Sequence, residues 1–420
     1  MHSKFFCSTL CWLFAGAVFT PTLAFAGENA ISIWSFEQSG YAPAGGLVAD
    51  RRGNLFGTTE GGGNGPCDGE SGCGTVFELT QAATPGGKWH YKVLYNFQGG
   101  SDGGFPGAQL TIDPVSGTVY GYTEYNSGGG NVFSLTPPAG KSGTWGFQNI
   151  YVFTGGADGS LFVSTAPLLF AGGMLYGVAK IGGVAGCGEN GCGTFFRLQP
   201  GPSGRGSTAW IEKNLISFSG KGASGLPASA VGPDSENAFY VATGWDHGAV
   251  YRVTLTAIGN ATASAIMRFK GGNDGGPNNL VLGLNGDVYG LRGIGPGPTA
   301  VFQLVPPVNA NSLWTYAEIA KVASHGYGPD ALSLGSGGGL LGTIYGDVDF
   351  YPGNVFALTP PALGSTGPWA YREVWSFING PDRNPINVVM GRGTQQTNLF
   401  SVLSGGDSGG GSVVEITGGE

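Results

Sequence analysis

Five aspartates lie in glycine-containing segments that recur along the chain, and they are the acidic side chains best placed to do chemistry. They are Asp102, Asp158, Asp274, Asp330 and Asp382. If these segments meet at one edge of the fold, their carboxylates could bind cations or polar ligands such as sugars. The alternative is a local role, because an aspartate beside glycine stabilises a tight turn by accepting hydrogen bonds from nearby backbone. We expect a ligand-binding rim at these five residues.

Four cysteines form the second chemical signal, in two segments of similar sequence. Cys67 and Cys73 enclose Asp-Gly-Glu-Ser-Gly, and Cys187 and Cys192 enclose Gly-Glu-Asn-Gly. An even number of cysteines in an exported chain favours disulfides, and pairing within each segment is the simplest of three connectivities. The spacing also allows zinc ligation. We expect two local disulfides that hold two long loops in shape.

The other residues give no concentrated catalytic pattern. His90, His247 and His325 lie in unrelated repeats, and no Gly-x-Ser-x-Gly motif stands at a strand-to-helix turn. Paired carboxylates for glycoside hydrolysis would escape this search, because they can meet in space from distant repeats. We therefore expect no metal and no cofactor, and the catalytic residues of any activity stay unknown at this stage.

The composition indicates that short strands must position these side chains. Of 420 residues, 82 are Gly and 25 are Pro, while 41% are hydrophobic and only 11% are charged. Such a chain is too apolar for disorder, lacks the Gly-X-Y period of collagen, and has no long stretch of helix formers. The 19 basic residues against 27 acidic residues argue against a nucleic-acid partner.

Two short motifs alternate along the chain and predict repeated strands. The first is an aliphatic or aromatic pair usually followed by glycine, with copies at 54–57, 118–121, 174–177, 238–240, 287–290, 339–342 and 398–400. The second reads Gly-Thr-Val-Phe-Glu-Leu-Thr in its first copy, and its copies begin at positions 74, 130, 193, 248, 299, 353 and 411. A further strand precedes the first motif, and a fourth strand, five times opened by Trp, follows the second. Four short strands per unit are typical of a β-propeller blade.

The ends of the chain predict how the ring closes. The first three strands occur seven times, but the fourth strand follows them only six times. The missing copy is at the start, where Ile31 to Phe36 matches Glu373 to Phe377. We expect an all-β, seven-bladed propeller of four-stranded antiparallel blades, with the N-terminal strand closing the last blade. An open solenoid of the same units is the alternative. Chain parity places both cysteine loops and the blade-linking aspartates on one rim.

The first 26 residues predict export. Lys4, the uncharged run from Leu10 to Phe19 and the small-x-small ending at Ala26 are typical of a cleaved signal peptide. Residues 27–420 then form a single propeller domain, with no membrane span after cleavage and no visible C-terminal anchor. We expect a monomer, secreted or periplasmic, in a bacterium.

The first repeat carries a family resemblance. The run 53–59 with 72–80, and the linking segment 94–97 followed by 102–106, resemble the GloVer tandem-repeat proteins, bacterial exported proteins also called "choice-of-anchor". The resemblance covers nearly all of 27–420 and is weak around 231–243 and 391–404. It implies a propeller-like fold and export, and it implies no settled activity or catalytic residues.

These observations lead to a ranked set of functions. The leading interpretation is an exported, non-enzymatic binding or scaffold propeller that holds a glycan or protein partner on one rim. The alternative is a secreted carbohydrate-active hydrolase or lyase with acidic residues at the channel mouth, for which one carboxyl group should have a raised pKa. A structural envelope protein is a third interpretation.

Overall fold

The protein is described by a computed structural model of residues 29–418. It leaves out 37–42, 68–71, 82–86, 125–128, 141–142, 162–165, 185, 188–189, 203–209, 222–224, 245–246, 257–258, 271–275, 294–298, 310–311, 323–328, 347–352, 363–366, 378–381, 393–397 and 406–409. The expected signal peptide at 1–26 and His325 lie outside the described residues. Among the described residues, no helix is long and apolar enough to cross a membrane.

The described strands form seven antiparallel sheets of four strands each, which are the blades of a propeller. Blade 1 comprises β2 (Val48–Ala49), β3 (Leu55–Thr59), β4 (Thr75–Thr80) and β5 (His90–Asn96). Blade 2 comprises β6 (Thr111–Ile112), β7 (Val119–Thr123), β8 (Asn131–Thr136) and β9 (Gly146–Val152). Blade 3 comprises β10 (Leu169–Ala171), β11 (Met174–Ala179), β12 (Thr194–Pro200) and β13 (Trp210–Ser217). Blade 4 comprises β14 (Pro227–Val231), β15 (Ala238–Thr243), β16 (Ala249–Leu255) and β17 (Ala261–Arg268). Blade 5 comprises β18 (Pro277–Leu282), β19 (Val288–Arg292), β20 (Thr299–Val305) and β21 (Thr315–Val322). Blade 6 comprises β22 (Pro329–Leu334), β23 (Leu340–Ile344), β24 (Asn354–Thr359) and β25 (Ala370–Ser376). Blade 7 comprises β26 (Asp382–Met390), β27 (Leu399–Gly405), β28 (Ser412–Thr417) and the N-terminal strand β1 (Asn29–Ser35).

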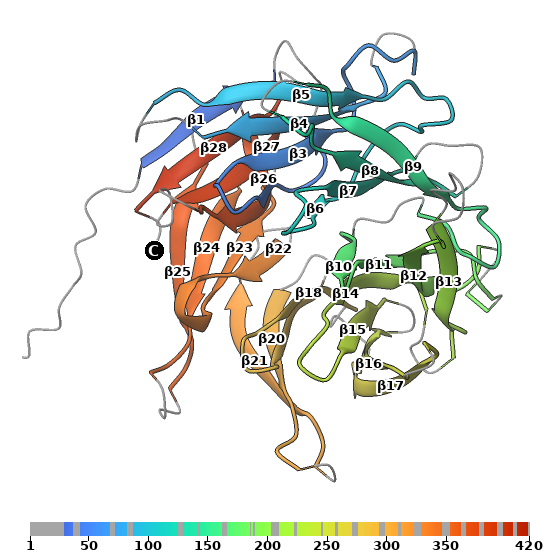
Figure 1. The fold of residues 1–420 in the computed structure, drawn as a ribbon. Helices are drawn as coiled ribbons and strands as arrows, with labels where there is room; N and C mark the ends of the chain where they lie inside the picture. Colours follow the sequence, from blue (N-terminus) through green and yellow to red (C-terminus); the bar gives the residue numbers. More distant parts are fainter. Residues whose placement is uncertain are drawn as a thin grey trace, which may run out of the picture.

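The N-terminal strand closes the ring, as the sequence predicts. Figure 1 shows β1 lying beside β28, so that the first and last strands of the chain share one blade. The two strands are antiparallel, with Asn29 opposite Thr417 and Ser35 opposite Ser412. The backbone N–H of Phe36 continues the ladder to the carbonyl of Gly411 at 3.0 Å. The predicted fold class, a seven-bladed β-propeller with a closed last blade, is confirmed.

Glycine in the first motif makes room for phenylalanine in the second. Gly57 on β3 lies opposite Phe77 on β4, and a Cβ atom at Gly57 would lie 2.5 Å from the ring of Phe77. The same arrangement recurs in blade 5, where a Cβ at Gly290 would lie 2.5 Å from the ring of Phe302. Since neither position can hold a larger side chain without displacing a fully buried ring, the two motifs must occur together.

Tryptophan in the fourth strand joins neighbouring blades. In five interfaces an indole packs edge-on against the aromatic residue of the first motif of the preceding blade, with ring centroids 5.3 to 6.1 Å apart. These pairs are Trp89–Phe400, Trp145–Phe56, Trp210–Tyr120, Trp314–Tyr240 and Trp369–Tyr289. Edge-to-face packing is the favoured geometry of aromatic pairs. The core therefore lies between the blades, where the sequence places these side chains.

Both predicted disulfides form, Cys67–Cys73 and Cys187–Cys192. Each packs against the segment that enters the next blade: the N–H of Phe105 donates to the carbonyl of Cys73 (2.9 Å), and that of Leu226 to Cys192 (2.8 Å). We call this the disulfide face. The opposite face, formed by the turns between first and second and between third and fourth strands, is the turn face. Disulfides are typical of chains that fold in an oxidising compartment.

Candidate functional site

Two of the five predicted aspartates stabilise turns on the disulfide face. Asp102 is buried, and its Oδ2 accepts hydrogen bonds from the Tyr95 hydroxyl and the Gln98 backbone N–H, each at 2.9 Å. Asp158 accepts from the N–H of Thr154 at 2.8 Å and from its hydroxyl at 2.6 Å. These contacts are those of the turn role that the sequence left open. Ligand binding by the two carboxylates stays a prediction.

For the other three predicted aspartates, the structure describes no side chain. Asp274 lies outside the described residues. Asp330 and Asp382 belong by their backbone to β22 and β26, the innermost strands of blades 6 and 7. Their side chains are outside what the structure describes, so the structure does not bring these three carboxylates together into a site.

A cavity of about 900 Å³ lies on the turn face, opposite the predicted rim. Its walls come from the first turn and the strands of blade 5, and from the first turn and the third and fourth strands of blade 6. Leu340 packs in a cluster with Tyr289 of blade 5, whereas Leu341 packs in a cluster with Leu399 of blade 7. Because both leucines line it, the cavity reaches both faces of blade 6 around the end of the sheet.

A glycine-rich turn keeps this cavity open. The turn from Gly335 to Gly339 contains one side chain beyond hydrogen, that of Ser336, and includes the 3-10 segment η2 (Ser336–Gly338). A Cβ atom at Gly337 or Gly338 would meet no atom within 4 Å, because both point into open space. Both residues also have positive φ angles, +58° and +82°, which glycine adopts without strain. In blades 1 and 4 the first position of this turn is aspartate, Asp50 or Asp234, and its side chain accepts hydrogen bonds from the backbone of its own turn.

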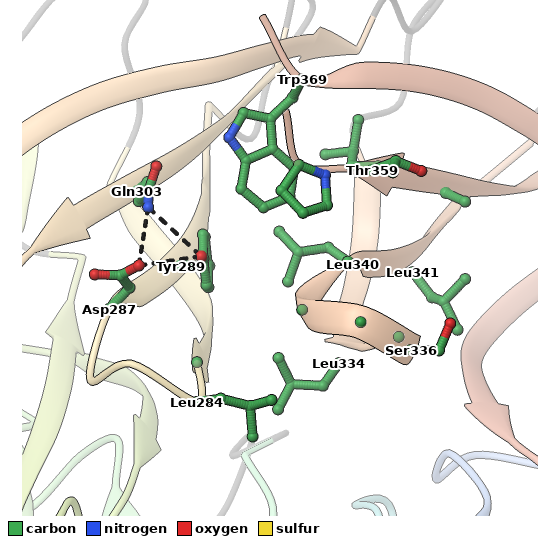
Figure 2. A pocket seen from close by; sticks show the side chains of 18 of the residues that line it. Leu284, Asp287, Tyr289, Gln303, Leu334, Ser336, Leu340, Leu341, Thr359 and Trp369 are labelled. Carbon is green, nitrogen blue, oxygen red and sulfur yellow. Dashed lines mark hydrogen bonds between the residues drawn. The ribbon is translucent and has the colours of Figure 1, made fainter. Parts of the chain in front are cut away.

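Asp287 is the carboxylate of the cavity, and its position is fixed on several sides. It lies where the first turn of blade 5 ends, and its carbonyl accepts from the N–H of Gly283 at 2.8 Å. Its Oδ2 accepts from Gln303 Nε2 at 3.0 Å and from the Tyr289 hydroxyl at 3.3 Å. Figure 2 shows these three residues along one wall of the cavity. No described residue hydrogen-bonds Oδ1, which leaves that oxygen able to accept a proton.

One of the two groups that donate to Asp287 is a phenol that keeps its proton. Burial and the charge of Asp287 raise the pKa of Tyr289 to about 12. Tyr289 is therefore a hydrogen-bond donor at any physiological pH. The arrangement suits a general base, which must be ionised before the reaction.

Trp369 forms the facing wall. Its indole packs against Tyr289 with ring centroids 5.6 Å apart, and in Figure 2 its nitrogen points to the side on which Gln303 lies. The wall continues through Leu340, Leu334 and Thr359. Aromatic faces beside a few polar groups are typical of small-molecule sites, including those for sugars. Arg372, which lies opposite Ala357 on the neighbouring strand, is the basic residue of the lining.

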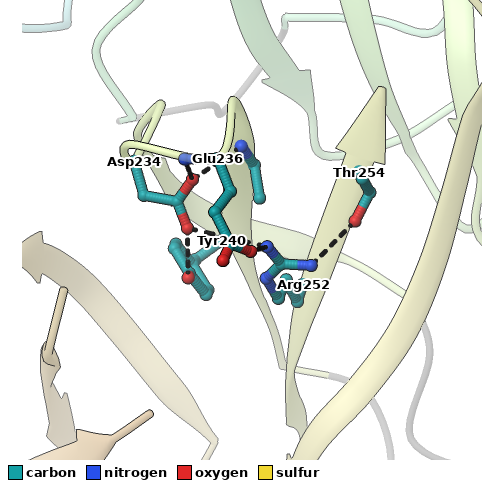
Figure 3. Close-up of polar contacts among 6 residues, drawn as sticks. Asp234, Glu236, Tyr240, Arg252 and Thr254 are labelled. Atoms are coloured by element: carbon teal, nitrogen blue, oxygen red, sulfur yellow. Dashed lines mark hydrogen bonds and ion pairs between the residues drawn. The ribbon is translucent and has the colours of Figure 1, made fainter. Parts of the chain in front are cut away.

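Blade 4 has the same aspartate–tyrosine pair without a comparable cavity among the described residues. Tyr240 donates to Asp234 Oδ2 at 2.7 Å, and Asp234 Oδ1 accepts from the backbone N–H groups of Glu236 and Ala238. Arg252 then bridges Glu236 at 2.6 Å and Thr254 at 3.0 Å (Figure 3). Every charged group in this cluster has a partner, so the cluster has a structural role. It provides a matched control for Asp287.

A second hollow of about 540 Å³ opens at the central channel, also on the turn face. Inner strands of five blades line it, and its side chains are largely aliphatic: Val48, Ala49, Val231, Leu280, Val281, Leu282, Leu334, Val389 and Met390. We call it the channel mouth. The alternative function inferred from the sequence requires acidic residues at the channel mouth. The described residues that line this hollow include no acidic side chain, and their charged residue is Arg392.

One carboxyl group has a strongly raised pKa, but it lies elsewhere. Burial and the charge of Asp158 raise the pKa of Glu212 to about 7. Glu212 lies on β13 at the interface between blades 2 and 3, and its Oε1 is buried with no hydrogen-bond partner among the described residues. At the interface between blades 1 and 2 the equivalent position on β9 is Phe147, which stacks on Tyr95 at 4.1 Å. Glu212 thus replaces an aromatic residue in a packed interface.

Metal ligation has no support in the described geometry. Within the part of the chain that the structure covers, no three His, Cys, Asp or Glu side chains lie close enough together to hold an ion.

Comparison with solved structures supports the propeller fold. No protein-family model and no curated protein matches the sequence. Among the similar solved structures are the following three. An ancestral GH74 enzyme has a TM-score of 0.57 at 12% identity, over 90% of this chain and 48% of that one. A candidate 6-phosphogluconolactonase from Bacteroides uniformis has 0.51 at 14%, over 80% and 88%. Another from Bacteroides fragilis has 0.50 at 14%, over 88% and 91%.

These neighbours contradict the leading functional interpretation from sequence. A non-enzymatic binding or scaffold propeller was favoured because no catalytic motif is visible along the chain. The similar propellers have names of hydrolase enzymes, which favours the enzymatic alternative. The interpretation failed for a physical reason. A site on a propeller combines side chains from different blades, and a linear search for motifs does not detect such a combination.

Asp287, Tyr289, Gln303 and Trp369 were not identified from the sequence. Each belongs to a repeated strand motif or opens a fourth strand, and none was singled out as a candidate site residue. The available signal was the departure from the repeat: an acidic residue at the first position of the first motif in blade 5, followed by a turn of glycines in blade 6.

Proposed function

We propose that the protein is an exported carbohydrate-active hydrolase that opens a sugar lactone in the cavity between blades 5 and 6. The observation that carries the proposal is Asp287, held by two donors at the wall of a 900 Å³ cavity and facing the aromatic side chain of Trp369. The names of the two similar propellers from Bacteroides support a lactone substrate. The two disulfides and the predicted signal peptide support export. Membership of the GloVer family stays a prediction.

The residues of the cavity favour an ester bond over a glycosidic bond. Hydrolysis of a glycoside uses two carboxyl groups on either side of the bond. Among the described lining residues, Asp287 is the one carboxylate. Hydrolysis of a lactone needs one base to activate water and hydrogen-bond donors for the carbonyl oxygen.

The mechanism follows from the placement of these groups. Asp287 Oδ1 takes a proton from water, and the water oxygen bonds to the carbonyl carbon of the lactone. The Trp369 indole N–H, on the opposite wall, donates to the carbonyl oxygen as it gains negative charge. The bond between the carbonyl carbon and the ring oxygen then breaks, and the ring oxygen receives the proton from Asp287. The product is the open hydroxy acid. Gln303 and Tyr289 keep Asp287 oriented throughout.

The experiment compares two matched variants. We expect purified wild-type protein to hydrolyse glucono-δ-lactone faster than buffer, measured by acid release with the background subtracted. Asp287→Asn should reduce kcat by about 100-fold or more, since general bases contribute on that scale. Asp234→Asn, which removes the carboxylate bonded to Tyr240, the tyrosine of blade 4 that corresponds to Tyr289, should leave kcat unchanged. No hydrolysis above background for any sugar lactone, or equal kcat in Asp287→Asn and wild type, would refute the proposal.

A further inference from the structure

The cavity and the channel mouth share a wall. Leu334, at the end of β22, lines both hollows. On blade 5, Leu282 belongs to the channel mouth, and the turn that directly follows it, from Gly283, belongs to the cavity. A molecule whose one end lies near Asp287 can therefore extend past Leu334 toward the central channel.

The channel mouth suits an apolar chain rather than a sugar. Apart from Gly391, Arg392 and Ser333, its lining is aliphatic, and the hydroxyl of Ser333 is already bonded to the Val388 carbonyl at 2.8 Å. Sugar hydroxyls placed against the aliphatic side chains would lose their hydrogen bonds to water without gaining new ones there, which costs free energy. Methylene groups gain from the same environment, because their burial removes apolar surface from water.

An exposed leucine extends this apolar surface to solvent. Leu284 lines the cavity, yet 84% of its surface is exposed. Figure 2 shows it at the end of the cavity near Leu334, away from Trp369. Leu284 and Leu334 thus lie at one end of the cavity, and Gln303 and Trp369 lie toward the other.

We propose that the substrate is an amphiphilic lactone, with its ring beside Asp287 and an alkyl chain that passes Leu334 into the channel mouth. This inference rests on the proposed lactone hydrolysis, and it names the substrate class of that site.

The first test is a series of δ-lactones that differ only in the length of an alkyl substituent. We expect kcat/KM to rise about threefold to fourfold for each added methylene, the gain for complete burial of that group. The rise should stop once the channel mouth is filled. The change should appear mainly in KM, because the chain lies away from the reacting bond.

The second test blocks the channel mouth without touching the cavity. Ala49→Phe places a ring in the lining contributed by blade 1, and it should abolish the dependence of kcat/KM on chain length. Ala263→Phe, at an exposed position on β17, is the matched control and should behave like wild type.

Binding of the corresponding lactams, measured by calorimetry, separates the two proposals because an amide ring resists hydrolysis. Affinity that grows with chain length, and that Ala49→Phe removes, supports the chain site even if no lactone is hydrolysed, in which case the proposed function alone fails. Hydrolysis of short lactones with a flat chain-length series, in both kcat/KM and lactam affinity, overturns this inference and leaves the hydrolase proposal standing.

Discussion

Glu212 provides a quantitative test of how burial controls the stability of this propeller. Burial and the charge of Asp158 raise its pKa to about 7, from an ordinary value of 4.5. The folded protein therefore binds this proton more tightly than the unfolded chain does. The contribution to stability is fully present below pH 4.5 and is lost as pH rises toward 7, because the folded state must then hold a charge in the interface. Stability should decrease with pH across this window.

The magnitude follows from the difference in pKa. A gap between 4.5 and about 7 corresponds to at most about 3 kcal/mol. Glu212 is only half-buried, so solvent screens the charge and about 1 to 2 kcal/mol is the realistic cost at pH 8. Glu212→Gln has nearly the shape of the protonated side chain and carries no charge. We expect it to stabilise the protein by that amount at pH 8 and to have no effect at pH 4.5.

The assay is denaturant unfolding at both pH values for wild type, Glu212→Gln and a control. Glu60→Gln is the control, since Glu60 is exposed at a turn and its substitution should change stability by less than about 0.5 kcal/mol. An equal gain for Glu212→Gln at both pH values would show that the charge is not the cause. A loss at pH 8 would mean that the ionised carboxylate makes a favourable contact, and the reasoning would be refuted.

Three further substitutions test the packing and the site. Gly57→Ala should destabilise the protein by about 1 to 3 kcal/mol, because its Cβ would lie 2.5 Å from the Phe77 ring; an unchanged unfolding midpoint would contradict this. Phe36→Ala, in the closing segment, should lower the free energy of unfolding by about 3 to 5 kcal/mol, because the Phe36 side chain is 1% exposed. A smaller loss in denaturant unfolding would mean that the contact between β1 and the rest of the propeller is weakly packed. Gly338→Asn, at a position with positive φ that asparagine tolerates, should place a side chain in the open cavity. It should raise KM for the lactone at least several-fold with little change in unfolding midpoint, whereas unchanged KM would mean that the substrate lies elsewhere.

The fold could be predicted because its determinants are local and repeated. Gly57 and Phe77 belong to two motifs that recur in every blade, and the Trp residues mark the fourth strands. The sequence of the closing strand also resembles that of its counterpart in blade 6. In each case the physical requirement, a ring beside a glycine or an indole between sheets, falls on a fixed position of the repeat.

The candidate site could not be predicted in the same way. Chain parity correctly placed the cysteine loops and the segments that contain Asp102 and Asp158 on one face. Parity cannot say which face is hollow, since a hollow depends on side chains that are absent, as at Gly337 and Gly338. Asp287 stands out as a candidate site residue only when its turn is compared with those of the other blades. The facing wall must also be known, and Trp369 contributes it from the next blade.

The pairing of β1 with β28 also sets an order of events during synthesis. β1 precedes every other described strand, whereas its hydrogen-bonding partner β28 follows all of them; the hydroxyl of Thr417 bonds the carbonyl of Asn29 across 388 positions. Six blades can assemble from neighbouring segments as they emerge, but blade 7 must wait until β28 is made. Closing so long a loop is slow compared with forming a hairpin. Until β28 emerges from the ribosome, β1 therefore stays unpaired. A truncated chain that lacks the six-residue β28 leaves β1 free to pair with another molecule.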